Sequence, residues 1–109
     1  MHLLRTHPQI FTHILVGNKK AEIFVDDEYY SDLDTAGIIR FFKDDGEYLE
    51  RDVSKVKRFN SFEETIKDIK IYNKLYPVIE NRKKAEEFFR YNFDGEIEED
   101  YGVIVAFFD

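Results

Sequence analysis

One uninterrupted apolar run lies near the end of the chain, Gly102-Val103-Ile104-Val105-Ala106-Phe107-Phe108. A strand with one face in water alternates apolar and polar residues, whereas a strand buried on both faces does not. The run therefore predicts a central strand with a neighbour on each side. Such a strand either enters the middle of a sheet or lies beside an early strand, and the sequence leaves that choice open.

Four earlier segments are predicted as strands, because apolar residues alternate or cluster in them and turn residues bound them. They form two hairpins, residues 10–16 with residues 21–26 and residues 36–43 with residues 48–53. Gly17-Asn18 supplies the turn of the first hairpin. Asp44-Asp45-Gly46-Glu47 supplies the turn of the second.

The hydrophobic period changes to a helical one at Ser61. Ser61-Phe62-Glu63-Glu64 has the form of a capping box, in which Ser61 accepts from the Glu64 amide and the Glu64 side chain reaches back. Apolar residues then recur at helical spacing, at Phe62, Ile66, Ile69, Tyr72 and Tyr76, and Pro77 ends the run. Ile71 and Leu75 fall on the opposite side, so either this helix is covered twice or its last turn breaks early.

A second helix is predicted over residues 81–92, with Ala85, Phe88 and Phe89 facing inward and Asp94-Gly95 closing it. The predicted order is therefore ββββααβ. Strands that precede helices, without βαβ alternation, indicate an α+β fold. We expect a mostly antiparallel sheet with two helices packed on one face, formed by residues 1–109 as a single domain.

The composition bounds the class of protein. With 109 residues, of which 43% are hydrophobic, the chain is long enough for one core. Charged residues make up 36%, and no apolar run approaches the roughly twenty residues of a membrane span, so no membrane association is predicted. The lack of cysteine excludes disulfides, thiolate zinc sites and cysteine nucleophiles. Without a secretory signal at its N-terminus, the chain is expected in the cytoplasm.

The net charge of −7 is distributed unevenly. Two segments are acidic, residues 22–52 with −8 and residues 94–109 with −6. Two are basic, residues 1–21 with +3 and residues 53–93 with +4. Because phosphate neutralisation requires a basic field, the net charge disfavours direct nucleic-acid binding by the whole surface.

The sequence contains no recognisable catalytic motif. His2, His7 and His13 form no helix-spaced ligand pair, no G-x-S-x-G motif surrounds a serine, and the glycines form no phosphate-binding loop. We therefore predict no enzymatic activity, no metal and no cofactor. One alternative stays open, because Asp32 and Asp34 have the D-x-D spacing of a divalent-cation site that a carboxylate-dependent enzyme could use.

Tyrosine recurs beside acidic clusters. The candidate partner-binding residues are Asp26, Asp27, Glu28, Tyr29 and Tyr30, followed by Asp32 and Asp34; Asp44, Asp45, Glu47 and Tyr48; and Glu98, Glu99, Asp100 and Tyr101. Tyrosine supplies rigid contact area at interfaces, and the acids supply negative charge. If the three clusters lie at neighbouring edges, they form a surface that fits a basic groove of a protein partner. The alternative is that the acids solubilise turns and the tyrosines end strands.

Basic residues recur on the predicted helices, at Lys67, Lys70, Lys74, Arg82, Lys83 and Lys84. A basic stripe can follow a phosphate backbone, so an alternative function is a nucleic-acid-binding module. The i,i+4 pair of Glu63 and Lys67, and the lack of interleaved aromatic residues, favour a solvated helix face instead. Opposite charges on the two parts of the chain also allow self-association into a homo-oligomer.

In composition the chain resembles the acidic, cysteine-free inhibitors of phages and mobile elements, which include nucleic-acid mimics that block nucleases. Acidic immunity proteins that neutralise basic toxins share this composition. The function predicted from the sequence is therefore a non-enzymatic binding or inhibitor protein that occupies a basic surface of its partner. A nucleic-acid-handling protein is the kind of partner that has such a surface.

Overall fold

The computed structural model describes residues 1–93 and 95–109, with the side chains of all of these except residues 95–97. The elements are, in chain order, β1 (His2–Arg5), α1 (Pro8–Leu15), β2 (Ala21–Val25), β3 (Ile38–Phe42), β4 (Tyr48–Asp52), β5 (Lys55–Phe59), α2 (Phe62–Ile66), α3 (Ile69–Leu75), α4 (Arg82–Arg90), α5 (Gly95–Tyr101) and β6 (Val103–Phe107). The α+β class is confirmed. The predicted order ββββααβ is wrong in detail, because the described residues form two sheets and five helices.

The central strand predicted near the end of the chain is β6. It lies between β2 and β5 and pairs antiparallel with both, so that Val105 is opposite Ile23 on one side and Lys57 on the other. Every residue of β6 and of β2 is buried. Both expected placements hold at once, because β6 is in the middle of its sheet and beside an early strand.

The strands form a second sheet, of order β1-β3-β4, where the hydrophobic pattern predicts only one. β3 and β4 make the expected antiparallel hairpin, and β1 joins β3 in parallel. The chain changes sheets between β4 and β5. The Val53 amide donates to the Gly37 carbonyl at 2.8 Å, and the next amide, of Ser54, donates to the Phe107 carbonyl in the other sheet at 2.7 Å.

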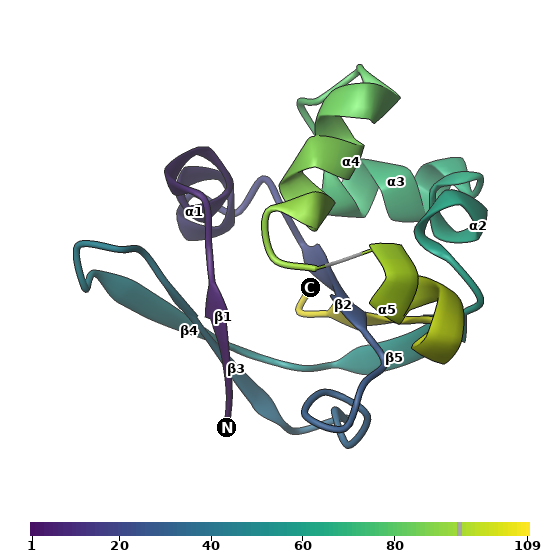
Figure 1. The fold of residues 1–109 in the computed structure, drawn as a ribbon. Coiled ribbons are helices and arrows are strands. Elements are labelled where there is room, and N and C mark those ends of the chain that lie inside the picture. The colour runs from purple at the N-terminus through teal and green to yellow at the C-terminus, as the bar shows by residue number, and fades with distance from the viewer. Residues whose placement is uncertain (94) are drawn as a thin grey trace.

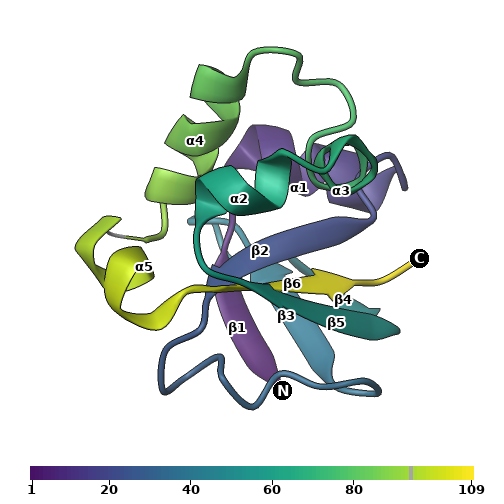
Figure 2. The same ribbon diagram turned by 90° about the vertical axis from the view of Figure 1, so that its right-hand side faces the viewer.

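The layers explain why β2 and β6 are buried on both faces. Helices α2, α3 and α4 cover one face of the β2-β6-β5 sheet, and the strands of the β1-β3-β4 sheet lie on its other side (Figure 2). Large apolar side chains fill the space between the layers, among them Phe24, Phe41 and Phe62, each at most 1% exposed. A sheet covered on both faces has no solvated side to produce alternation in the sequence.

The strand predicted over residues 10–16 is wrong, and so is the first hairpin, because this segment is the helix α1. Pro8 occupies the first turn, where its missing N–H costs nothing, and the His7 ring accepts from the Gln9 amide at 3.1 Å. Ile10, Phe11 and Ile14 form the buried face at helical spacing. Gly17-Asn18 therefore follows the end of a helix, not the turn of a hairpin.

The capping function of Ser61 is confirmed, because its Oγ accepts from the Glu64 amide at 3.1 Å. The Glu64 carboxylate does not reach back to Ser61 and instead accepts from Asn60 Nδ2 at 3.3 Å. The single predicted helix is divided into α2 and α3, and Asp68 Oδ1 caps α3 by accepting from the Lys70 and Ile71 amides at 3.0 and 3.4 Å. The break turns Ile71 and Leu75 inward, which resolves their misfit with a single stripe.

The second predicted helix is confirmed as α4, which Asn81 caps and which buries Ala85, Phe88 and Phe89. It ends at Arg90, before the predicted closure at Asp94-Gly95, and Asp94 lies outside the described residues. Strands β1 and β5 and helix α5 are missing from the prediction. These elements are short and contain charged residues, so their apolar periodicity is too weak to predict them.

Candidate binding surfaces

The tyrosines of the first acidic cluster attach their loop to the edge of β1. The Leu3 amide donates to the Tyr29 hydroxyl at 2.9 Å, and the Tyr30 hydroxyl donates to the Leu3 carbonyl at 2.8 Å. Tyr30 is only 8% exposed, and its burial raises the pKa of its hydroxyl. Tyr30 therefore belongs to the core, whereas Tyr29 is half exposed and can be reached by a partner.

Three aspartates of this loop have local structural partners. Asp27 Oδ1 accepts from the amides of Tyr29 and Tyr30, both at 3.0 Å. Asp34 Oδ1 accepts from the Thr35 amide at 2.7 Å. Asp32 Oδ1 is 2.7 Å from His2 Nε2, and this hydrogen bond lowers the pKa of the Asp32 carboxyl. Among the described residues, no group of three carboxylates or histidines suited to a metal ion forms here or elsewhere.

The second acidic cluster lies at the turn between β3 and β4, where Lys43 pairs with two of its three acids. Lys43 Nζ is 2.6 Å from Glu47 Oε1 and 3.6 Å from Asp45 Oδ2. The Asp45 carboxylate also accepts from the Glu47 amide at 2.9 Å, and this bond lowers the pKa of Asp45. The Arg40 guanidinium lies 4.1 Å from the centre of the Tyr48 ring. Figure 1 shows this turn at the far left of the molecule, well apart from α5 at the right.

The third acidic cluster is on α5 and divides into a buried and an exposed part. Glu98 is 4% exposed; it accepts from the Phe62 amide at the start of α2 and lies 2.5 Å from Arg90 Nη2. Glu98 thus joins α5 to α2 and α4 and has a structural role. Glu99, Asp100 and Tyr101 are exposed.

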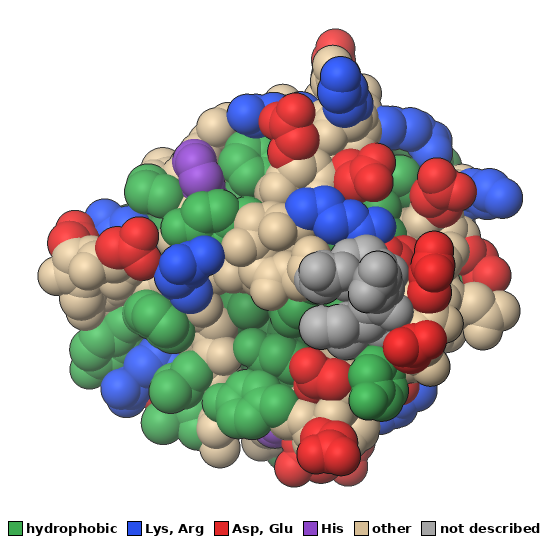
Figure 3. Space-filling model, in the orientation of Figure 1, with side chains coloured by type: hydrophobic (Ala, Val, Ile, Leu, Met, Phe, Trp, Pro, Cys, Tyr) green, Lys and Arg blue, Asp and Glu red, His purple; other side chains and the backbone are tan. Residues whose placement is uncertain are grey.

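One residue of the first cluster, Asp26, and three of the third, Glu99, Asp100 and Tyr101, line one surface hollow of about 540 Å³. We call it the acidic hollow, and its lining residues are Asp26, Arg58, Phe59, Asn60, Glu64, Glu99, Asp100, Tyr101 and Gly102. The Asp26 amide donates to the Gly102 carbonyl at 3.0 Å, which ties the end of β2 to the end of α5. Acidic side chains gather on this side of the molecule, at the lower right of Figure 3.

Asp26 and Arg58 form an ion pair in the lining of the acidic hollow. Asp26 Oδ2 is 3.1 Å from Arg58 Nε, and Arg58 Nη2 donates to the Ser31 carbonyl at 2.7 Å. Asp26 Oδ1 is buried and has no hydrogen-bond partner among the described residues. The sequence predicts the contributions of Asp26, Glu99, Asp100 and Tyr101. It misses Glu64, whose capping motif gives no sign of a second role.

The basic residues predicted on the helices do not form one stripe. Lys70 and Lys74 line a groove between α3 and β5, together with Lys55 and Lys57 of β5. Lys67, Arg82 and Lys83 line a different hollow with Glu63 and Glu86, and Lys84 pairs with Glu87 at 3.4 Å. Lys55 and Lys57 could not be assigned from the sequence, because β5 is not predicted as a strand.

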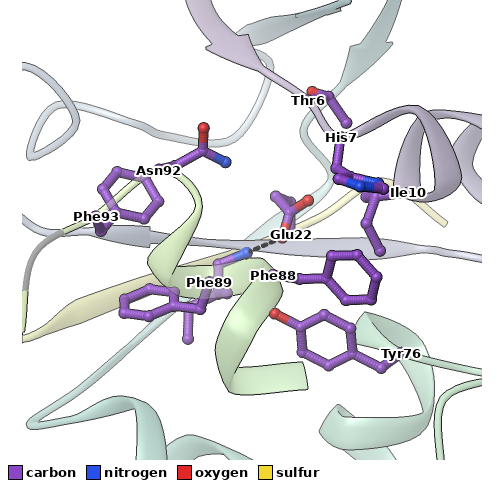
Figure 4. A pocket seen from close by; sticks show the side chains of 10 residues that line it. Thr6, His7, Ile10, Glu22, Tyr76, Phe88, Phe89, Asn92 and Phe93 are labelled. Carbon is purple, nitrogen blue, oxygen red and sulfur yellow. Dashed lines mark hydrogen bonds between the residues drawn. The ribbon is translucent and has the colours of Figure 1, made fainter. Parts of the chain in front are cut away.

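A small enclosed cavity lies beside β2, with Glu22 among His7, Phe88, Phe89 and Tyr76 (Figure 4). Its free volume of about 10 Å³ admits about one water molecule and no larger ligand. Beside it, Lys19 is 1% exposed and its Nζ lies 3.3 Å from Glu22 Oε1 and 4.5 Å from the centre of the Tyr76 ring.

The buried charges beside this cavity hold the core together. Lys19 Nζ also donates to the Leu75 carbonyl, which links the segment before β2 to the end of α3. Burial lowers the pKa of Lys19, and the nearby Glu22 opposes that shift. Burial raises the pKa of Tyr76. Because the cavity has no room for a substrate, we interpret this group as structural.

No protein-family model matches the sequence, and no curated protein matches it. Solved structures share the fold. The crystal structure of hypothetical protein PH0355 has a TM-score of 0.78 at 24% identity, covering 96% of this chain and 94% of its own. The solution structure of protein PF0455 from Pyrococcus furiosus has a TM-score of 0.66 at 21% identity, covering 96% and 92%. At these identities the likeness shows the fold alone. In the described part of the chain, no helix has the length and apolar character needed to cross a membrane.

Proposed function

We propose that this protein is a non-enzymatic binding protein whose acidic hollow holds a basic segment of a protein partner. The observation that carries the proposal is that Asp26, at the end of β2, lines the same hollow as Glu99 and Asp100 of α5. Proteins that handle nucleic acid present basic segments of this kind. The role that follows is that of a cytoplasmic inhibitor or nucleic-acid mimic, as in phages and mobile elements.

The charge of the hollow supports this proposal. Four carboxylates line it, and its one cationic side chain, Arg58, is already bound to Asp26. Glu64, Glu99 and Asp100 form no ion pair with any described lysine or arginine. An incoming arginine can bind such carboxylates with two parallel hydrogen bonds, and the exposed Tyr101 ring offers a face for a cation.

The second cluster is left out of the proposed site for a physical reason. Lys43 pairs with two of its three acids, Asp45 and Glu47, so this turn offers less uncompensated charge to a partner than the acidic hollow does. It is also at the other end of the molecule (Figure 1). The second cluster therefore provides a matched control.

Calorimetric titration with an octa-arginine peptide at low and moderate salt tests the proposal. We expect Glu99→Gln/Asp100→Asn to weaken binding about 25-fold, taking about fivefold for each contact-distance charge pair in water. The control Asp44→Asn/Glu47→Gln changes the net charge equally and should weaken binding less than threefold. Equal losses in the two variants would show that the peptide senses only the overall charge, and the proposal would then be wrong.

A further inference from the structure

We propose that the groove between α3 and β5 is a second binding site, which takes a small ligand carrying two or more phosphate groups. The groove has a volume of about 280 Å³. It is lined by Ser54, Lys55, Lys57, Asp68, Lys70, Ile71, Lys74, Phe107 and Asp109. We call it the lysine groove. It shares no lining residue with the acidic hollow.

Lysines converge on this groove from both of its walls. Lys55 of β5 and Lys74 of α3 lie over the same ring, that of Phe107, with their Nζ atoms 6.0 and 5.3 Å from its centre. An anion bound between the walls would be attracted by lysines from both of them.

Four lysines and two aspartates line the groove, so half of its positive charge stays uncompensated. Asp109 Oδ2 is 2.6 Å from Lys74 Nζ, and this bond lowers the pKa of Asp109. Asp68 accepts from the amides at the start of α3, which is its capping role. Lys55, Lys57 and Lys70 form no ion pair with any carboxylate in the described part of the chain.

Lysine on an edge strand also prevents pairing with another sheet, and β5 is an edge strand. That role explains Lys55 and Lys57, and the ion pair with Asp109 accounts for Lys74. Lys70 lies on a helix, which has no strand edge to protect, and it forms no ion pair in the described part of the chain. The presence of lysines on both walls is what points to a ligand.

The ligand class follows from charge density and from the lining. Three ammonium groups without an ion pair, around a small groove, favour a ligand with several negative charges in a small volume, which linked phosphates have. Lysine binds phosphate as a point charge, and no arginine is present to select a planar carboxylate. Phe107 is only 5% exposed, so its ring offers no surface for stacking a base. Recognition therefore depends on the phosphates and not on an attached nucleoside.

Calorimetric titration with inorganic tripolyphosphate at low salt tests this inference. We expect saturable binding that Lys55→Gln/Lys57→Gln weakens about 25-fold, again at about fivefold per ammonium group removed. Lys70→Gln should weaken it about fivefold. The control Lys67→Gln/Lys83→Gln changes the net charge equally at a different hollow and should change the affinity less than threefold.

Three comparison ligands complete the test. ATP should bind within about threefold of tripolyphosphate. A penta-glutamate peptide and a ten-nucleotide single-stranded DNA should bind at least tenfold more weakly. Tighter binding of the peptide or the DNA, or equal losses in the groove and control variants, would overturn the inference. Neither result bears on octa-arginine binding at the acidic hollow, so the two proposals fail separately.

Discussion

Gly102→Ala tests the junction that brings α5 to the acidic hollow. Gly102 has φ +76°, in the left-handed region, and a Cβ built there would lie 2.8 Å from the Phe59 carbonyl oxygen. The left-handed conformation costs a non-glycine residue about 1–2 kcal/mol. The collision is with backbone of β5, which pairs with β6, so relieving it costs a further ~1–3 kcal/mol. We expect Gly102→Ala to lower the free energy of unfolding by about 3 kcal/mol.

Gly46→Ala is the matched control for this substitution. Gly46 has φ +92°, and no heavy atom outside its chain neighbours lies within 4 Å of a Cβ built there. This change therefore has the conformational cost alone, about 1–2 kcal/mol. Urea unfolding at pH 7 measures both variants. Equal losses at Gly102 and Gly46 would refute the close approach of the α5–β6 junction to Phe59.

Three further predictions concern the core and its ionisable groups. Lys19→Met should lower the free energy of unfolding in urea by about 3 kcal/mol, because Glu22 loses its buried cation. Lys19→Met/Glu22→Gln should recover most of that loss. A single variant as stable as the unsubstituted protein would contradict the ion pair. Tyr30→Phe should lower the free energy of unfolding by about 1 kcal/mol at pH 7, because the Leu3 carbonyl loses its hydrogen-bond donor. A smaller loss than that of Tyr29→Phe would contradict a structural role for the Tyr30 hydroxyl. Burial raises the pKa of Tyr30 and Tyr76 above 10, so the unfolded chain loses these protons before the folded chain does. The free energy of unfolding should therefore fall as the pH rises above 10. Tyr30→Phe should reduce that fall, and a pH profile identical to that of the unsubstituted protein would contradict the buried state of Tyr30.

The sequence predicts the parts of the fold in which one local signal dominates. The continuous apolar run identifies β6, and Ser61 and Asn81 mark the starts of α2 and α4. Residues 10–16 mislead, because their apolar side chains satisfy strand and helix patterns alike. There the decisive signals are Pro8 and His7, which lie before the apolar residues.

The candidate sites depend on long-range pairing, which a local pattern does not contain. Asp26 meets Glu99 and Asp100 only because β2 pairs with β6, the strand that follows α5. Lys55 and Lys57 face α3 because β5 is the other neighbour of β6. The acidic clusters could thus be found one by one in the sequence, whereas which of them meet could not.

The most direct test of the acidic hollow is an NMR titration of the ¹⁵N-labelled protein with octa-arginine. We expect the largest amide shifts at Asp26, Phe59, Asn60, Tyr101 and Gly102, which line the hollow, and only small shifts in the turn from Lys43 to Tyr48. Largest shifts at that turn, or equal shifts at all exposed acidic residues, would contradict the proposal that Asp26 and the third cluster form one binding site.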